Sequence, residues 1–110
     1  MNFSPYGLLA MPEMPSAILG GESYRITGAG TYVLRDKQAV LVRILILSQP
    51  SSNALLNIYN HASAKTNLKA SVRIGTSISV PAVVECGIAD LNNGLVIETT
   101  QDFEAIVVFN

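Results

Sequence analysis

Residues 39–47 of the chain read Ala39-Val40-Leu41-Val42-Arg43-Ile44-Leu45-Ile46-Leu47, an apolar run that only Arg43 interrupts. One parity of the run is β-branched, which favours a pleated strand; its residues are Val40, Val42, Ile44 and Ile46. The other parity carries Leu41, Leu45 and Leu47 around Arg43. A strand with one face in water alternates apolar and polar residues, whereas this run is apolar on both faces. The pattern predicts either a central strand of a two-layer domain or a strand whose outer face lies under another subunit.

The chain from residue 22 onward reads as short strands separated by turn signals, with no apolar stripe at helical spacing. We expect strands at residues 22–27, 31–35, 39–47, 54–59, 69–74, 78–80, 83–89, 95–100 and 105–109. Asn93-Gly94 is a strong hairpin signal between residues 83–89 and 95–100, and residues 101–103 should connect a closing hairpin. The pattern predicts an all-β fold over residues 23–110, an antiparallel β-sandwich that is jelly-roll-like.

Residues 1–22 have a different composition, with three of the five prolines and all three methionines. Proline at this density prevents a continuous helix and removes ladder donors, so we expect an extended N-terminal arm. The arm is too apolar for a typical disordered tail, and we expect it to dock on a neighbouring surface; the alternative is that it folds back over its own domain. The residues expected to contact a partner or another subunit are Phe3, Tyr6, Leu8, Leu9, Met11, Met14, Ile18 and Leu19 in the arm, and Leu41, Arg43 and Leu45 in the apolar strand.

Charged residues make up 14% of the chain, against a usual share of about 25%. A small domain has a large surface for its volume, so few charges indicate either a polar uncharged surface or a surface partly hidden in an assembly. The net charge of -1 argues against nonspecific nucleic-acid binding, which needs clustered lysine and arginine.

The charges are segregated along the chain. Residues 16–81 contain seven basic and two acidic residues, whereas residues 82–110 contain five acidic residues and no basic one. We interpret this as neutralisation between neighbouring strands of one chain; the alternative is complementary patches that meet between subunits. In both cases Arg43 should find an acidic partner in residues 82–110.

Few residues are suited to catalysis or metal binding. The chain has one histidine, His61, expected in an exposed loop, and one cysteine, Cys86, expected as a buried thiol, so neither a zinc site nor an internal disulfide is predicted. The carboxylates near the last turns match no calcium-loop spacing; they are Asp90, Glu98, Asp102 and Glu104. We therefore expect no enzymatic activity, no catalytic residue, no cofactor and no metal.

The sequence contains no apolar run near the roughly 20 residues that span a membrane. It also lacks the basic and apolar segments of a signal peptide. We expect a soluble protein that is made in a reducing compartment and has no membrane partner.

Two runs within residues 40–110 carry a family resemblance. The first is a strand, a polar loop and a second strand, residues 42–47 and 55–60, which ends Leu56-Asn57-Ile58-Tyr59-Asn60. The second is Asn93-Gly94-Leu95-Val96-Ile97-Glu98-Thr99-Thr100, followed by residues 105–110, AIVVFN. Together they resemble runs in small structural proteins of tailed bacteriophages. The resemblance implies a virion protein of the head decoration, or cement, type, commonly a trimer on the capsid surface, and it brings no catalytic residues.

The hypothesis from sequence is a non-enzymatic capsid decoration protein that is made in the host cytoplasm and binds and stabilises the shell of the major capsid protein. The sandwich should form a homo-oligomer, a trimer, through the outer face of its apolar strands, while the arm holds the capsid or a neighbouring subunit. The alternatives are another virion component, such as a tail or fibre-associated β domain, and a soluble ligand- or glycan-binding β-sandwich.

Overall fold

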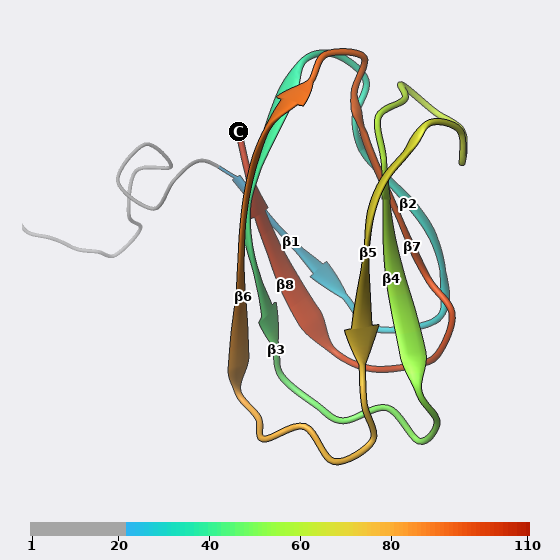
Figure 1. Ribbon diagram of the computed structural model, residues 1–110, viewed down its shortest axis with the longest axis vertical. Helices are drawn as coiled ribbons and strands as arrows, with labels where there is room; N and C mark the ends of the chain where they lie inside the picture. The colour runs from blue at the N-terminus through green and yellow to red at the C-terminus, as the bar shows by residue number, and fades with distance from the viewer. Residues whose placement is uncertain (1–21) are drawn as a thin grey trace, which may run out of the picture.

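Residues 22–110 are described by the computed structural model, and they form eight β-strands and no helix (Figure 1). The strands are β1 (Glu22–Ile26), β2 (Gly30–Arg35), β3 (Ala39–Ile46), β4 (Ala54–Tyr59), β5 (Leu68–Ile74), β6 (Ala82–Leu91), β7 (Leu95–Thr99) and β8 (Ala105–Phe109). The all-β prediction is confirmed. A strand predicted at residues 78–80 is wrong, because these residues lie in the connection from β5 to β6, where Ile78 packs against the core.

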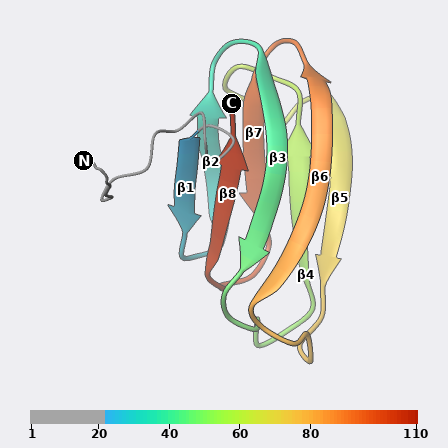
Figure 2. The same ribbon diagram turned by 90° about the vertical axis from the view of Figure 1, so that its left-hand side faces the viewer.

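The strands form two antiparallel sheets that pack against each other. The first sheet has the order β1-β8-β3-β6, and the second has the order β2-β7-β4-β5. Figure 1 shows the two sheets as separate layers, and Figure 2 shows the first sheet facing the viewer, with β1 and β6 at its edges.

Only the β4–β5 connection joins neighbouring strands of one sheet; every other connection in residues 22–110 crosses to the opposite sheet. The two predicted hairpins are therefore wrong, because β7 lies in a different sheet from both β6 and β8. The Asn93-Gly94 turn serves another purpose. The backbone N–H of Asn93 donates to Oδ1 of Asn60 at 2.9 Å, and Gly94 lies against the backbone of Arg35 and His61. The turn thus anchors the start of β7 to a distant loop.

Strand β3 lies between β8 and β6, and its register shifts in the middle. Leu41 faces Phe109 of β8, whereas Arg43 faces the adjacent Val108, so Val42 is an extra residue that forms a bulge. The residues of β3 that point into the core are Ala39, Leu41, Ile44 and Ile46. The prediction that Leu41 shares a face with Arg43 and Leu45 is wrong, because the bulge reverses the alternation. Leu41 is 0% exposed and offers no surface to a partner.

The core fills the space between the sheets with aliphatic side chains from every strand but β2, whose partly buried Tyr32 and Leu34 pack against its edge. The strand predicted at residues 54–59 is β4, and its residues alternate, with Ala54, Leu56 and Ile58 buried. Phe103, from the connection between β7 and β8, adds an aromatic ring to the same core. Such burial, at about 25 cal/mol per Å² of apolar surface, is the main favourable contribution to folding.

The predicted domain boundary lies close to the start of the described residues. Glu22 ends the predicted arm and begins the strand predicted at residues 22–27, and in the structure it is the first residue of β1. The expected arm contacts lie outside the described residues; they are Phe3, Tyr6, Leu8, Leu9, Met11, Met14, Ile18 and Leu19. Among residues 22–110 no helix is long and apolar enough to cross a membrane.

Candidate interaction surface

The outer face of the second sheet carries polar groups that bind one another, and it also exposes the side chains of Val33 and Leu55. Glu98 on β7 accepts hydrogen bonds from Nδ2 of Asn57 at 3.1 Å, from the hydroxyl of Tyr59 at 3.0 Å and from Nζ of Lys65 at 3.0 Å. The bond from Lys65, followed by that from Asn57, holds the pKa of Glu98 below its ordinary value. Ser71 extends the network by donating to Oδ1 of Asn57. These polar groups therefore have little need of a partner.

A loop covers the remaining apolar residue at the centre of this face. Val96 faces outward between its register partners Val33 and Tyr59, yet it is 0% exposed. Residues 60–67 fold back over this end of the sheet, where Asn60 holds Asn93 and Lys65 holds Glu98.

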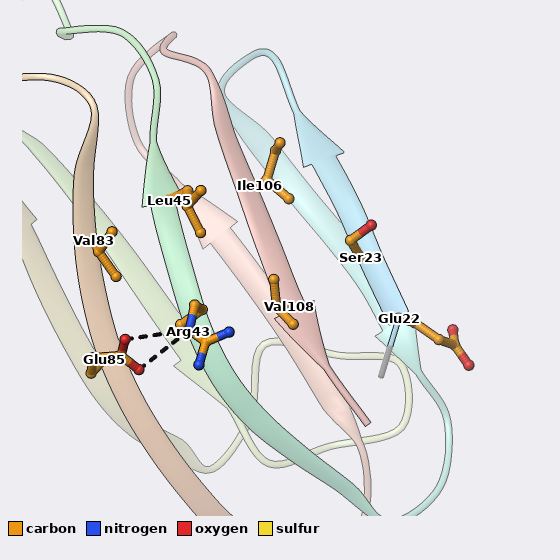
Figure 3. A pocket seen from close by; sticks show the side chains of 8 residues that line it. All are labelled: Glu22, Ser23, Arg43, Leu45, Val83, Glu85, Ile106 and Val108. Atoms are coloured by element: carbon orange, nitrogen blue, oxygen red, sulfur yellow. Dashed lines mark hydrogen bonds and ion pairs between the residues drawn. The ribbon is translucent and has the colours of Figure 1, made fainter. Parts of the chain in front are cut away.

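The outer face of the first sheet is different, since it carries a hollow of about 450 Å³ (Figure 3). The hollow is lined by Glu22, Ser23, Arg43, Leu45, Val83, Glu85, Ile106 and Val108. Strand register places these side chains in two rows: Val108, Arg43 and Glu85 in one, and Ile106, Leu45 and Val83 in the other. Four of the side chains are aliphatic, and Val83 is 57% exposed. No loop of the described chain covers them in the way that residues 60–67 cover Val96.

One ion pair lies within the hollow. Nε of Arg43 is 3.3 Å from Oε2 and 3.4 Å from Oε1 of Glu85, as the dashed lines in Figure 3 show. The prediction that Arg43 finds an acidic partner in residues 82–110 is confirmed. Within residues 22–110 the two terminal amino groups of Arg43 have no hydrogen-bond partner, and the Glu85 side chain is 67% exposed. The pair can therefore bind a further charged group without losing its present contact.

Other ion pairs account for the segregation of charge along the sequence. Basic residues of the first two thirds of the chain pair with acidic residues of the last third in Arg25–Glu104, Arg43–Glu85, Lys65–Glu98 and Lys69–Asp90. The interpretation is confirmed in part: the charges pair within one chain, but only Arg43–Glu85 joins neighbouring strands of one sheet. Lys65 and Glu104 lie in connections, and Lys69–Asp90 joins the two sheets. Exposed pairs of this kind contribute about 0–1 kcal/mol each, so they balance charge more than they stabilise the fold.

The residues considered for catalysis have structural roles. Nδ1 of His61 accepts the backbone N–H groups of Ser63 and Ala64 at 3.1 and 3.0 Å, which shapes the loop and leaves the ring partly buried rather than exposed. Cys86 is partly buried against the core, and burial raises the pKa of its thiol, as does the nearby Glu85. A thiol of this kind is a weak nucleophile.

The carboxylates considered for calcium do not converge. Asp90, Glu98 and Glu104 each belong to a separate ion pair, and Asp102 accepts the backbone N–H of Ala29 at 2.7 Å. Residues 22–110 contain no group of three histidine, cysteine, aspartate or glutamate side chains placed to hold a metal.

The structure brings two of the predicted contact residues, Arg43 and Leu45, into the hollow and places Leu41 in the core. Sequence reasoning missed Val83, Ile106 and Val108. The signal for the last two was present, because residues 105–109 are apolar on both parities, as residues 39–47 are. Applied to residues 105–109, the same criterion predicts a second strand that is apolar on both faces, and the structure then places it beside β3.

The fold and its surface define a two-layer all-β domain with a largely aliphatic hollow on the outer face of its first sheet. Comparison with protein-family models, curated proteins and solved structures finds no match for the chain.

Proposed function

We propose that this chain is a non-enzymatic virion protein of the capsid-decoration type, built as a jelly roll and acting as a homo-oligomer. The strand orders β1-β8-β3-β6 and β2-β7-β4-β5 support a jelly roll, because that fold consists of eight strands in two sheets with most connections crossing between them. Jelly rolls are common among viral capsid and lectin domains. Between these two classes, the family resemblance of residues 40–110 favours a virion protein.

The observation that carries the proposal is the aliphatic hollow on the first sheet. Apolar side chains gathered on the outer face of a small domain mark a contact with another macromolecule. The hollow is shallow and open to one side of the sheet, lined by four aliphatic side chains and one ion pair. Those features suit packing against a protein surface.

The free energy that burial of the hollow can supply indicates that the hollow acts together with another contact. Fully burying one valine, leucine or isoleucine contributes about 1.5–3 kcal/mol, and three of the four aliphatic side chains in the hollow are already partly covered. Association costs about 4–15 kcal/mol before any net affinity appears. The hollow therefore cannot supply both the contact between copies and the contact with the capsid, and we assign the capsid contact to residues 1–21, which are rich in apolar side chains and precede β1 at the rim of the hollow.

In this proposal the chain is made in the host cytoplasm and seats on the outer surface of the capsid as a trimer. Its partners are other copies of the chain and the major capsid protein. The first-sheet face joins the copies, and the N-terminal residues bind the shell.

The test begins with the genes beside the one that encodes this chain, where we expect a major capsid gene, and then uses empty capsids assembled from its product. The full chain should co-sediment with them to a saturating ratio and raise the temperature at which they break open. A variant that lacks residues 2–21 should keep its circular dichroism spectrum and its oligomeric state but remain in the supernatant. Failure of the full chain to bind these capsids overturns the proposal. Selective binding on a glycan array in that case would assign the protein to the glycan-binding alternative.

A further inference from the structure

We propose that the hollow on the first sheet receives the same face of a second copy of this chain, with Arg43 of one copy bound to Glu85 of the next. The inference rests on the self-association in the proposed function and names the residues that carry it. Its test is carried out in solution, without capsids.

The face is self-complementary in charge. Arg43 and Glu85 are register partners on adjacent strands, so they lie at the same height along the sheet, and Leu45 and Val83 are partners in the same way. If the symmetry axis is parallel to the strands, each of these register pairs lies at the same height along the axis in every copy. Arg43 then meets the Glu85 of its neighbour, and Leu45 meets its Val83. In a ring of three copies the contact is head to tail, with the β3 side of one face against the β6 side of the next.

The geometry of the ion pair leaves room for the second contact. Arg43 uses Nε for its own Glu85, and its two terminal amino groups are without a partner in the described residues (Figure 3). A guanidinium group has five N–H donors in a fixed plane and can bind two carboxylates at once. Burying a charge without enough partners is costly, so a carboxylate from the neighbouring copy is the group that allows this face to be covered.

The other outer face makes a poor alternative. Glu98 already has three donors, and residues 60–67 cover the central valine. The net charge of -1 per chain gives copies little reason to repel each other. A second copy therefore fits the first-sheet face in both its charge and its apolar character.

The test exploits opposite charge reversals. Arg43→Glu places two acidic groups in the hollow, and Glu85→Arg places two basic groups there. Each variant alone should associate about tenfold more weakly or worse, because like charges meet across the interface. In a mixed trimer two of the three contacts join opposite charges, so an equimolar mixture should form oligomers that contain both variants more readily than either variant forms them alone, as detected by native mass spectrometry and sedimentation velocity.

A matched pair of valines tests the apolar part. Val83 lies in the hollow on edge strand β6, and Val33 lies on edge strand β2 of the second sheet; they are 57% and 51% exposed. Val83→Lys should dissociate the oligomer, whereas Val33→Lys should leave it intact. Both variants should retain the wild-type circular dichroism spectrum.

The proposal is overturned if the wild-type chain is monomeric at high concentration or if the charge variants stay oligomeric. It is also overturned if the double variant Arg43→Glu/Glu85→Arg associates normally while the mixture of single variants does not, since the pair would then act only within one chain. Loss of capsid binding by a chain that still forms these oligomers would refute the decoration function and leave this contact standing.

Discussion

Replacing Gly94 with alanine should destabilise the protein much more than the same change at Gly30, although the two glycines have nearly the same backbone conformation. Their φ angles are +146° and +152°, which L-residues rarely adopt. A Cβ atom on Gly30 would meet nothing within 4 Å. A Cβ atom on Gly94 would lie 2.5 Å from the carbonyl oxygen of His61, 2.6 Å from that of Arg35 and 2.9 Å from Cα of Ala62.

The comparison of the two variants separates the cost of the backbone conformation from the cost of the steric clash. An alanine held in this backbone region costs about 1–3 kcal/mol, and this cost applies to both variants. Gly94→Ala also forces backbone atoms of two other segments to move, which adds about 1–3 kcal/mol by analogy with overpacked cores. Small domains are stable by about 5–15 kcal/mol, so Gly94→Ala removes a large share of the total.

Equilibrium urea unfolding of both variants, followed by circular dichroism, measures the difference. With a typical urea dependence of about 1–3 kcal/mol per M, the midpoint of Gly94→Ala should lie roughly 1 M below that of Gly30→Ala. Equal midpoints would refute the reasoning, because they would mean that residues 61 and 62 do not pack against the start of β7.

Two further predictions test the bulge in β3 and the network around Glu98. Leu41→Ala should cost about 2–5 kcal/mol of unfolding free energy, whereas Leu45→Ala should cost about 1 kcal/mol or less in the monomer, since Leu45 lies on the outer face; equal losses in thermal or urea unfolding would contradict the reversed alternation. In the folded state Lys65 and Asn57 lower the pKa of Glu98. The contribution of the ionised Glu98 to the free energy of unfolding is therefore complete above the unfolded-state pKa of about 4.3, and it is lost as the pH falls through the folded-state pKa. Glu98→Gln should therefore be less stable than the wild type at pH 7, and the gap should close in urea titrations toward pH 3; a gap that is independent of pH would count against this assignment.

Much of the secondary structure follows from residue patterns that act over a few neighbours. The alternation in residues 54–59 predicts the strand and separates its residues into two faces, and the structure buries the face of Ala54, Leu56 and Ile58. The sequence also predicted correctly that Arg43 has an acidic partner. A charge on an apolar strand needs a counter-ion, and every acidic residue of the last third lay in or beside a predicted strand or turn.

The candidate surface was predictable only in part. Arg43 and Leu45 were named because residues 39–47 are apolar on both parities, but the bulge at Val42 moved Leu41 to the other face. A bulge depends on how two other strands pair with β3, and no local pattern in residues 39–47 specifies it. Val83 could not be grouped with Ile106 and Val108 until β6 and β8 were known to flank β3.

The sequence by itself determined that this protein is all-β and where most of its strands lie. It also determined which strands carry apolar residues on both faces. These properties depend on side chains a few residues apart, whose spacing matches the two-residue period of a strand. Only the tertiary structure decided that Asn93-Gly94 joins two sheets rather than a hairpin, that Leu41 and Leu45 point in opposite directions and that four aliphatic side chains share one outer face. The physical reason is that strand pairing satisfies backbone hydrogen bonds between residues far apart in sequence, and many pairings satisfy them equally well until the side chains of both sheets must fit one core.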